Sequence, residues 1–598
     1  MSIRTCAKIV AALLLVFLLV GLRYVVPGKV GDVEFVPGQH QTLVVFGPSL
    51  GGRASTPDLE KLVRASFPNS DFLIANYSNY WFSNSSPFEM ASLIEKSIRS
   101  AHERHNYSNI VLFGYSTGGL LLRKAYVWGH GYDSDRPIPA TQHPWVDRVE
   151  RFVSLAAPNR GWPNAKPKNM WGYQYAFVYL GGAFARLTGT GQVALELLQG
   201  SRFVANMRVQ WIDLMRARGD KAPLVVHLIG GKDELVDRED SIDIQAGAAE
   251  RVVIKTLDGL NHVEIATGIY KAGATHELTS VGETITMALT RKRDEFPQYW
   301  PDKTGLLQTD PDIKQLIFVM HGIRDESNWP LDIKRAIEKQ IGEQSKAVKV
   351  QPPQYRRFTM LPFLLYWDRQ ENVRWFMDQY TEAKALYPNI EYVDFVGHSN
   401  GTYILASALQ QYSVLKVRNV FFAGSVVPIH YDWKKRVNDK QVTGKIWNIC
   451  ADFDWVVAIF PQLFQQISDW MKEEHPHTGL LDIGSAGFRG FRADVGTEAS
   501  LRNVRYIVGE HGAAFETAKA ERLAAIVDFM TSGDERKLEA LKETDDPSAW
   551  LAHLSNLSWA IWAIGLSVIV SIGVWTYQRG FRWFAIYVLL ILGIVTTV

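Results

Sequence analysis

The chain has 598 residues, more than a single hydrophobic core usually holds, so several domains are expected. Its 64 basic and 62 acidic residues nearly balance, which argues against a nucleic-acid partner and against a strongly acidic substrate. Only two cysteines are present, Cys6 and Cys450, so neither an internal disulfide framework nor a cysteine-rich metal site is expected. The 19 tryptophans fit contact with lipid, or equally a large core with anchors at a membrane interface.

The first predicted element is an apolar segment at the N-terminus. Residues 9–22 are apolar without interruption, with Arg4 and Lys8 before them and Arg23 after them. The run is short for a spanning helix, but the next residues extend it while Arg23 reaches toward the interface. A cleaved signal peptide is the competing interpretation, although no clear small-x-small cleavage site ends the run. We predict an uncleaved transmembrane anchor over residues 1–27.

Strands and helices then alternate over residues 35–290, which predicts an α/β domain with a mostly parallel sheet. Within it, residues 114–118 read Gly-Tyr-Ser-Thr-Gly, between the apolar run 109–113 and a helical pattern. Strand, sharp turn and helix are the context in which G-x-S-x-G forms a nucleophile elbow. Glycines on either side of the serine let the backbone turn without Cβ clashes, so the hydroxyl of Ser116 is held at the tip.

A long insertion, residues 159–222, separates two predicted strands of this first half. It is expected to form a cap or lid over the nucleophile, and its aromatic residues suit an acyl chain. A cap that packs only on itself is the alternative. The aromatic residues are Trp162, Trp171, Tyr173, Tyr175, Phe177, Tyr179 and Phe184.

A polar, proline-containing stretch at residues 291–313 is predicted to be a linker, and a second copy of the pattern follows over residues 314–530. Residues 397–401 read Gly-His-Ser-Asn-Gly after the apolar run 392–396, which predicts a second elbow at Ser399. His398 in this motif is interpreted as a supporting or surface residue, as are Glu264 and Arg324.

The C-terminal part is predicted to enter the membrane. A charged helical connector over residues 531–556 precedes a transmembrane hairpin over residues 557–598, whose two apolar stretches flank a loop with Arg579 and Arg582. Tryptophan and tyrosine stand near the ends of these stretches, as an aromatic belt predicts. Basic residues favour the cytoplasmic side, so the loop is placed there, and so is the N-terminus with Arg4 and Lys8. Arg23 and Lys29, just beyond the first span, favour the opposite orientation. With three spans, both large domains then lie on the exoplasmic or periplasmic side.

The order of these elements resembles the α/β-hydrolase superfamily, of the lipase and esterase kind. The resemblance covers roughly residues 35–290 and 314–530, and it rests on both elbows and on G-x-D-x-x-V at residues 231–236. It implies two tandem α/β-hydrolase domains, each a mostly parallel sheet flanked by helices. Nucleophile, acid and histidine are expected in that chain order within each domain.

The resemblance assigns a catalytic triad to each half. A serine hydroxyl attacks only when a histidine accepts its proton, and a carboxylate holds that histidine in the required tautomer. In the first half the triad is Ser116, Asp233 and His262, with Asp237 as an alternative acid. In the second half it is Ser399, Asp454 and His511, with Asp452 as the alternative acid.

Oxyanion donors follow by analogy with the same family. Residues 48–52, Pro-Ser-Leu-Gly-Gly, resemble the H-G-x-G-G turn of many lipases, with Pro48 and Ser49 in place of His and Gly. His321-Gly322-Ile323 matches the usual form. The implied oxyanion donors are the backbone N–H groups of Leu50 and Thr117 in the first site and of Ile323 and Asn400 in the second.

The sequence therefore predicts a membrane-anchored serine hydrolase that cleaves carboxylic esters, with a lipid or lipophilic acyl ester as substrate. An acyltransferase on the same scaffold, in which an alcohol resolves the acyl-enzyme, is the first alternative. A peptidase or amidase is less favoured because nothing marks a peptide-binding cleft, and a membrane-tethered binding protein with one or both domains inactive is the remaining one. No cofactor, metal or nucleic acid is expected, and the pattern names no protein partner.

Overall fold

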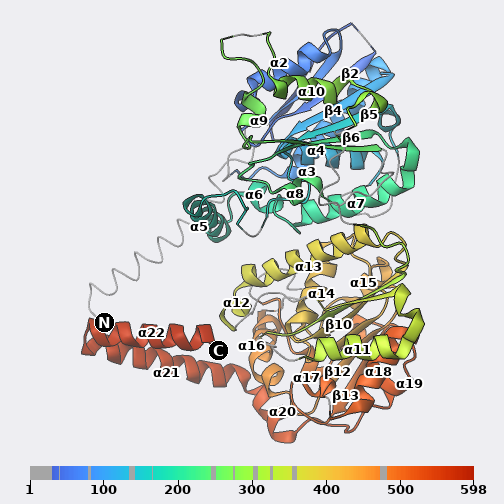
Figure 1. The fold of residues 1–598 in the computed structure, drawn as a ribbon. Helices are drawn as coiled ribbons and strands as arrows, with labels where there is room; N and C mark the ends of the chain where they lie inside the picture. Colours follow the sequence, from blue (N-terminus) through green and yellow to red (C-terminus); the bar gives the residue numbers. More distant parts are fainter. Residues whose placement is uncertain are drawn as a thin grey trace. The chain divides into compact units, whose positions relative to one another are not determined.

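The structure is a computed structural model of the chain (Figure 1). It describes residues 30–39, 41–77, 83–132, 142–163, 166–243, 251–273, 276–298, 300, 308–323, 328–352, 360–471, 481–497, 499–516 and 518–597. The predicted N-terminal anchor, residues 1–27, lies outside the described residues, as does Arg324. The chain divides into unit 1, Met1–Gln308 with Met377–Leu386, and unit 2, Thr309–Phe376 with Tyr387–Val598.

Unit 1 is built on a seven-stranded sheet of order β1-β3-β2-β4-β5-β6-β7. Only β1 is antiparallel to its neighbour, and the other pairs are parallel. The next strand in the chain, β3, therefore lies on one side of β2, and the strand after it, β4, lies on the other side. Ligands of such sheets bind beyond the carboxyl ends of the strands at this reversal. The strands are β1 (Asp32–Val36), β2 (Thr42–Gly47), β3 (Asp71–Asn76), β4 (Asn109–Tyr115), β5 (Val149–Leu155), β6 (Leu224–Gly230) and β7 (Val252–Leu257).

Helices cover both faces of this sheet, because its inner strands are apolar on both sides (Figure 1). One hydrophobic cluster joins the sheet to α3, α4 and α7, and a second joins the other face to α2 and α10. The helices of unit 1 are α2 (Pro57–Ser66), α3 (Pro87–His105), α4 (Thr117–Gly129), α5 (Gly172–Thr188), α6 (Gln192–Glu196), α7 (Arg202–Arg218), α8 (Arg238–Ile242), α9 (Glu264–Thr267) and α10 (Ser280–Thr290).

The predicted insertion over residues 159–222 has two parts in the structure, one buried and one exposed. Its second half, α7, is a core helix, with Phe203, Met207 and Trp211 buried in the cluster against α4. Its first half contains α5, where Tyr173 and Phe177 are 72% and 77% exposed. The aromatic side chains of α5 face outward instead of lining a pocket, so the expected acyl-chain lining is not seen.

Unit 1 also includes a segment from the second half of the chain. Residues Met377–Leu386, the C-terminal part of α13 (Tyr366–Leu386), group with unit 1. Asp378 accepts hydrogen bonds there from Arg208 at 2.7 Å and from Arg160 at 2.6 Å. The boundary after Gln308 falls within the predicted linker, residues 291–313. The linker's first part nevertheless packs into the unit 1 core through Trp300.

Unit 2 has a six-stranded, wholly parallel sheet of order β13-β12-β11-β10-β8-β9. From β8 onward its strands repeat the order of unit 1 from β2 onward, which confirms the parallel sheets predicted for the two halves. The repeat extends to the backbone: Ser116 and Ser399 have φ of 52° and 51°, and Ala156 and Gly424 have φ of 46° and 54°. The strands are β8 (Gln315–Met320), β9 (Val348–Gln351), β10 (Tyr392–His398), β11 (Val420–Ala423), β12 (Ile446–Ala451) and β13 (Leu501–Ile507).

Helices also cover both faces of the unit 2 sheet. A hydrophobic cluster joins one face to α11 and α18. On the other face the ring of Phe376, from α13, packs against those of Phe318 and Phe395. The remaining helices are α11 (Trp329–Ile341), α12 (Met360–Leu364), α14 (Asn400–Gln411), α15 (Trp433–Asn438), α16 (Trp455–Met471), α17 (Ala486–Arg489), α18 (Ala520–Ser532), α19 (Arg536–Glu539), α20 (Ala549–Asn556), α21 (Ser558–Arg579) and α22 (Phe581–Thr597).

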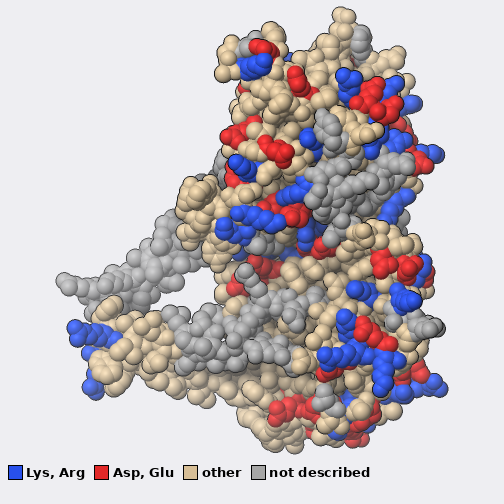
Figure 2. All heavy atoms as spheres, in the orientation of Figure 1, with Lys and Arg blue, Asp and Glu red and all other residues tan. Residues whose placement is uncertain are grey.

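The predicted connector, residues 531–556, is packed onto unit 2. The N–H of Tyr506 in β13 donates to the carbonyl of Thr544 at 2.7 Å, and Arg522 forms an ion pair with Glu543 at 2.7 Å. Beyond it, α21 is long and apolar enough to cross a membrane, whereas the apolar part of α22, Phe581–Ile591, is shorter. Along α21 the surface in Figure 2 carries no charged side chain before the basic residues near its end.

Candidate active site

Both serines of the repeated motif sit at strained turns between a strand and a helix. Ser116 has φ 52° and ψ −124°, and Ser399 has φ 51° and ψ −119°. A non-glycine residue adopts a positive φ only when its surroundings impose it, and such residues gather at functional sites. Each turn leaves no room for a side chain two residues after the serine. A Cβ on Gly118 would lie 1.9 Å from the carbonyl oxygen of Gly47, and a Cβ on Gly401 would lie 2.4 Å from that of Met320.

In unit 1 the structure brings the three predicted triad residues together. His262 Nε2 lies 2.9 Å from Ser116 Oγ, and His262 Nδ1 lies 2.7 Å from Asp233 Oδ2. All three side chains are buried. This geometry lets the imidazole accept the serine proton at Nε2 while the carboxylate holds the proton at Nδ1.

Asp233 is fixed in place by the start of the next loop. Its Oδ1 accepts hydrogen bonds from the N–H groups of Leu235 and Val236, both at 2.9 Å, which leaves Oδ2 for the histidine. The alternative acid, Asp237, is engaged elsewhere, since its carboxylate accepts from the N–H of Lys168. Of the two carboxylates, only Asp233 contacts His262 among the described residues.

Two further side chains hold the backbone of His262, and sequence reasoning missed both. Glu234 Oε2 accepts from the His262 N–H at 3.0 Å, and the Tyr115 hydroxyl donates to the His262 carbonyl at 2.7 Å. The rings of Tyr115 and His262 also stack, with centroids 5.5 Å apart. Burial, reinforced by the negative charges of Asp233 and Glu234, raises the pKa of Tyr115, so its hydroxyl stays protonated as a donor. Glu264 instead accepts from the N–H of Asn261 at the start of α9.

Unit 2 assembles only part of the equivalent site. His511 Nδ1 lies 2.9 Å from Asp454 Oδ2, while the alternative acid Asp452 accepts from the N–H of Gly509. Among the residues that the structure describes, no hydrogen bond joins Ser399 Oγ to His511. His398 occupies the position of Tyr115: its Nε2 lies 3.0 Å from the His511 carbonyl oxygen, and the two rings are 4.7 Å apart. The residue before the serine thus supports the histidine backbone in both units.

Two of the four predicted oxyanion donors, Thr117 and Asn400, lie at the elbows as the first residues of α4 and α14, where backbone N–H groups point out of the helix end. The turn after β2 contacts its elbow, since a Cβ on Gly118 would lie 2.6 Å from the Pro48 carbonyl oxygen; Leu50 is buried in this turn. In unit 2 the turn holding Ile323 is equally near, because a Cβ on Gly322 would lie 2.8 Å from Ser399 Cβ.

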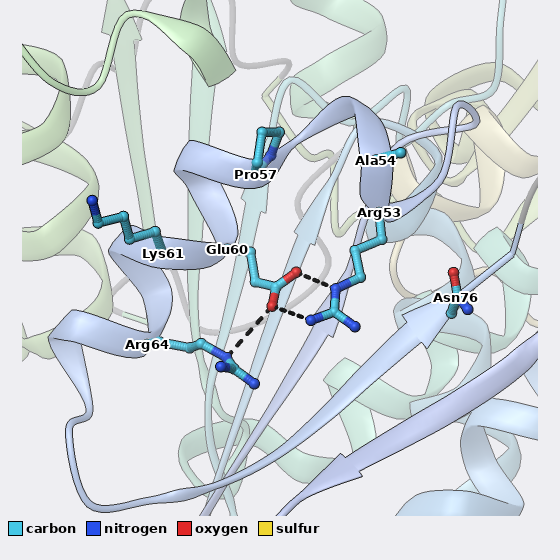
Figure 3. A pocket seen from close by; sticks show the side chains of 7 residues that line it. All are labelled: Arg53, Ala54, Pro57, Glu60, Lys61, Arg64 and Asn76. Atoms are coloured by element: carbon cyan, nitrogen blue, oxygen red, sulfur yellow. Dashed lines mark hydrogen bonds and ion pairs between the residues drawn. The ribbon is translucent and has the colours of Figure 1, made fainter. Parts of the chain in front are cut away.

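A separate hollow of about 590 Å³ lies on unit 1, beside α2 and the preceding 3-10 helix (Figure 3). Glu60 bridges Arg53 and Arg64 across it, at 2.5 Å and 3.5 Å. Arg53 also pairs with Glu34, so two carboxylates balance the guanidinium groups of Arg53 and Arg64, and no triad residue lines the hollow. Within the described part of the chain, no group of three or more His, Cys, Asp or Glu residues could hold a metal ion.

Comparison with known proteins gives matches of fold only. No protein-family model matches the chain, and no curated protein matches it. Among solved structures, a lipase-esterase related protein from Clostridium acetobutylicum matches at 16% identity over 40% of this chain and 96% of that one, with a TM-score of 0.25. A monoacylglycerol lipase from Paleococcus ferrophilus matches at 14% identity over 43% and 95%, with a TM-score of 0.25. Phospholipase PlaB from Legionella pneumophila matches at 16% identity over 42% and 60%, with a TM-score of 0.28.

At these identities and TM-scores the matches bear on no individual residue of the chain. The assignment of each site residue comes from the chain's own sheet order, elbow geometry and hydrogen bonds. Over about 40% of its length, the chain is similar to α/β-hydrolases of the lipase and esterase kind.

Proposed function

We propose that the protein is a serine hydrolase that cleaves carboxylic esters, with Ser116, His262 and Asp233 as its catalytic triad. The observation that carries this proposal is the continuous hydrogen-bond chain from Ser116 Oγ through His262 to Asp233, at 2.9 Å and 2.7 Å. Serine, histidine and carboxylate in contact are the arrangement that converts a hydroxyl into a nucleophile. Its position at an elbow of an α/β sheet adds support.

The reaction follows from the positions of these groups. Ser116 Oγ attacks the ester carbonyl carbon, and its proton passes to His262 Nε2. The N–H groups of Leu50 and Thr117 stabilise the oxyanion, where one donor contributes roughly 3 kcal/mol. The imidazolium then gives its proton to the departing alcohol, which leaves an acyl group on Ser116. Water, deprotonated by His262, releases the acid.

We assign the same chemistry to Ser399, Asp454 and His511 as a second, separable site. In its favour are the His511–Asp454 contact and the elbow at Ser399. Attack by Ser399 requires its Oγ to come within hydrogen-bond distance of the His511 ring, and rotation about the serine Cα–Cβ bond is the side-chain motion that moves Oγ. Ile323 and Asn400 are the proposed oxyanion donors.

We further propose that the substrate is a lipid or lipophilic acyl ester and that the protein is integral to a membrane. The spanning length and composition of α21 support membrane insertion, as do the exposed aromatic side chains of α5. Residues 557–598 are proposed to form a hairpin with Arg579 and Arg582 on the cytoplasmic side, which leaves the catalytic units exoplasmic or periplasmic. Labelling a Gln578→Cys variant with a membrane-impermeant thiol reagent tests this orientation: labelling only after permeabilisation is expected, and labelling of intact cells would contradict it.

Fluorophosphonate labelling tests the nucleophiles separately. Wild type, Ser116→Ala, Ser399→Ala and the double variant are treated with the same probe, and the adducts are mapped by mass spectrometry. We expect Ser116→Ala to lose the adduct of the first site and the double variant to lose all labelling. Labelling that persists in the double variant would refute both assignments. Product analysis with added acceptor alcohols then separates a hydrolase from an acyltransferase.

A further inference from the structure

The helix α16 carries a stripe of apolar side chains on its outer side. Its buried side mixes apolar and polar residues, which are Val457, Ala458, Phe460, Pro461, Gln462, Gln465 and Ser468. Its outward face carries apolar residues at spacings of three and four, as one helix face requires. These partly or fully exposed residues are Val456, Ile459, Leu463, Ile467 and Trp470. A stripe of apolar side chains that stays partly or fully exposed is expected where the surroundings are apolar.

The base of α21 is fastened to this helix. The Ser558 hydroxyl donates to the Ile459 carbonyl at 2.5 Å, and the Trp562 indole N–H donates to the same carbonyl at 3.2 Å. Gln466 accepts from the N–H of Trp559 at 3.1 Å. The middle of α16 is therefore held at the first turn of α21, the part of a spanning helix that lies at the membrane interface.

Tryptophans surround this junction. Trp455, Trp550 and Trp559 are each at least 50% exposed, and Trp470 is 83% exposed. Tryptophan concentrates where a membrane meets water, because one part of the ring is apolar and the N–H is polar. Along α21, Trp559 and Tyr577 lie roughly 27 Å apart at ~1.5 Å per residue. That separation is close to the ~30 Å thickness of a bilayer's hydrocarbon core.

The same helix begins at the second candidate site. Asp454 Oδ1 accepts from the N–H of Val457 at 3.0 Å, which caps α16, while Oδ2 contacts His511 at 2.9 Å. Asp454 thus both contacts His511 in the second site and caps the first turn of α16. Any surface on which α16 rests lies next to this site.

We propose that the outward face of α16 lies in the lipid–water interface, in the plane of the bilayer, and holds the second site at the membrane surface. The occupant of this face is the bilayer itself, because the face is continuous with the base of α21. The exposed apolar stripe, the attachment to α21 and the surrounding tryptophans each point to lipid. The inference rests on the membrane insertion proposed for α21 and extends it to the orientation of unit 2.

Spin labels on the full chain in phosphatidylcholine vesicles test the inference. Labels are attached to Trp455→Cys and Trp470→Cys, at the two ends of α16, in a Cys6→Ser background; Cys450 is buried. Lys435→Cys, on the exposed side of α15, is the matched control. Collision with dissolved oxygen and with a water-soluble nickel chelate reports depth. We expect both α16 labels to show oxygen-to-nickel collision ratios several times that of the control and similar to each other.

Each other result overturns the inference. Ratios equal to that of the control would place α16 in water, and unequal ratios at its two ends would show that it does not lie in the bilayer plane. Dipolar broadening that disappears on dilution with unlabelled protein would show a second copy on this face. A label at Ile569→Cys, in the middle of α21, reports insertion separately, so a failure of the proposed membrane span is distinguished from a failure of this inference. None of these readings depends on turnover.

Discussion

The buried ion cluster of unit 1 shows how the second half of the chain stabilises the first. Arg208 is 1% exposed and pairs with Asp243 at 2.6 Å and with Asp378 at 2.7 Å. Asp243 is shared with Arg123, also buried, at 3.2 Å. Asp378→Ala would leave two buried guanidinium groups facing one carboxylate.

The expected cost follows from these contacts. Removing one partner of a buried ion pair typically costs about 3–5 kcal/mol, because the remaining charge cannot recover its hydration. In the Asp378→Ala variant, Arg160 is less buried than Arg208 and still pairs with Glu382 at 3.2 Å. We therefore expect the free energy of unfolding to fall by an amount within this range. The entropy of unfolding is ~2.1 cal/mol/K per residue, so for a unit as long as Met1–Gln308 with Met377–Leu386 a loss of 1 kcal/mol corresponds to roughly 1.5 °C. The melting temperature of unit 1 is therefore expected to fall by roughly 5–8 °C.

Scanning calorimetry of the detergent-solubilised chain measures this change. A chain with two units is not expected to unfold in one transition, so the transition of unit 1 is followed by itself. Glu338→Ala, on α11 of unit 2, is the control and is expected to leave the unit 1 transition unchanged. A shift below 2 °C for Asp378→Ala would refute the reasoning, since the cluster would then hold no buried charge in need of a partner.

Three further predictions concern the first site and its surroundings. Tyr115→Phe removes the hydroxyl that donates to the His262 carbonyl. Because a hydrogen bond contributes about 0.5–1.5 kcal/mol, kcat on a soluble short-chain ester should fall about 2- to 10-fold. KM and the melting temperature should change little. An unchanged kcat would show that Tyr115 does not position the histidine. Burial, aided by the charge of Arg123, lowers the pKa of His227 to about 3, so the folded protein keeps this residue neutral while the unfolded chain binds a proton below pH ~6.5. The free energy of unfolding should therefore decrease as the pH falls from about 6.5 toward 3, by up to ~1.4 kcal/mol per pH unit from this group. His227→Asn should make the melting temperature less dependent on pH in this window. Equal pH dependence in both proteins would contradict this. Phe177→Asp, on the exposed side of α5, should slow hydrolysis of a long-chain ester in vesicles while leaving a soluble ester unaffected, and equal rates on vesicles would show that α5 does not contact lipid.

The elbows and the alternation of strands and helices could be predicted because their requirements are local. Glycine is needed on both sides of Ser116 and Ser399 because the start of the helix there lies close to a neighbouring strand of the sheet. An apolar run of strand length precedes each motif. Asp233 could be preferred over Asp237 by position in the motif, but the contact with His262 arises only through folding.

Other features depend on contacts that no local pattern records. Arg208 and Asp378 are 170 residues apart in the chain, so their pairing has no sequence signal. The core position of α7 did have one, because Phe203, Met207 and Trp211 recur at helical spacing, and the lid interpretation overlooked it. The side chains that hold the backbone of His262 had a weaker signal, because Tyr115 and Glu234 bond to its carbonyl and its N–H, groups that nearly every residue has.

The central claim is that Ser116 carries the acyl group during turnover. Wild type and His262→Gln are mixed with a p-nitrophenyl ester, quenched in acid within the first turnovers, digested and examined by mass spectrometry. The wild-type peptide containing Ser116 should gain the mass of the acyl group, and the variant should gain little or none in the same time. Ester hydrolysis without an acyl group on this peptide, or an equal adduct in His262→Gln, would contradict the account.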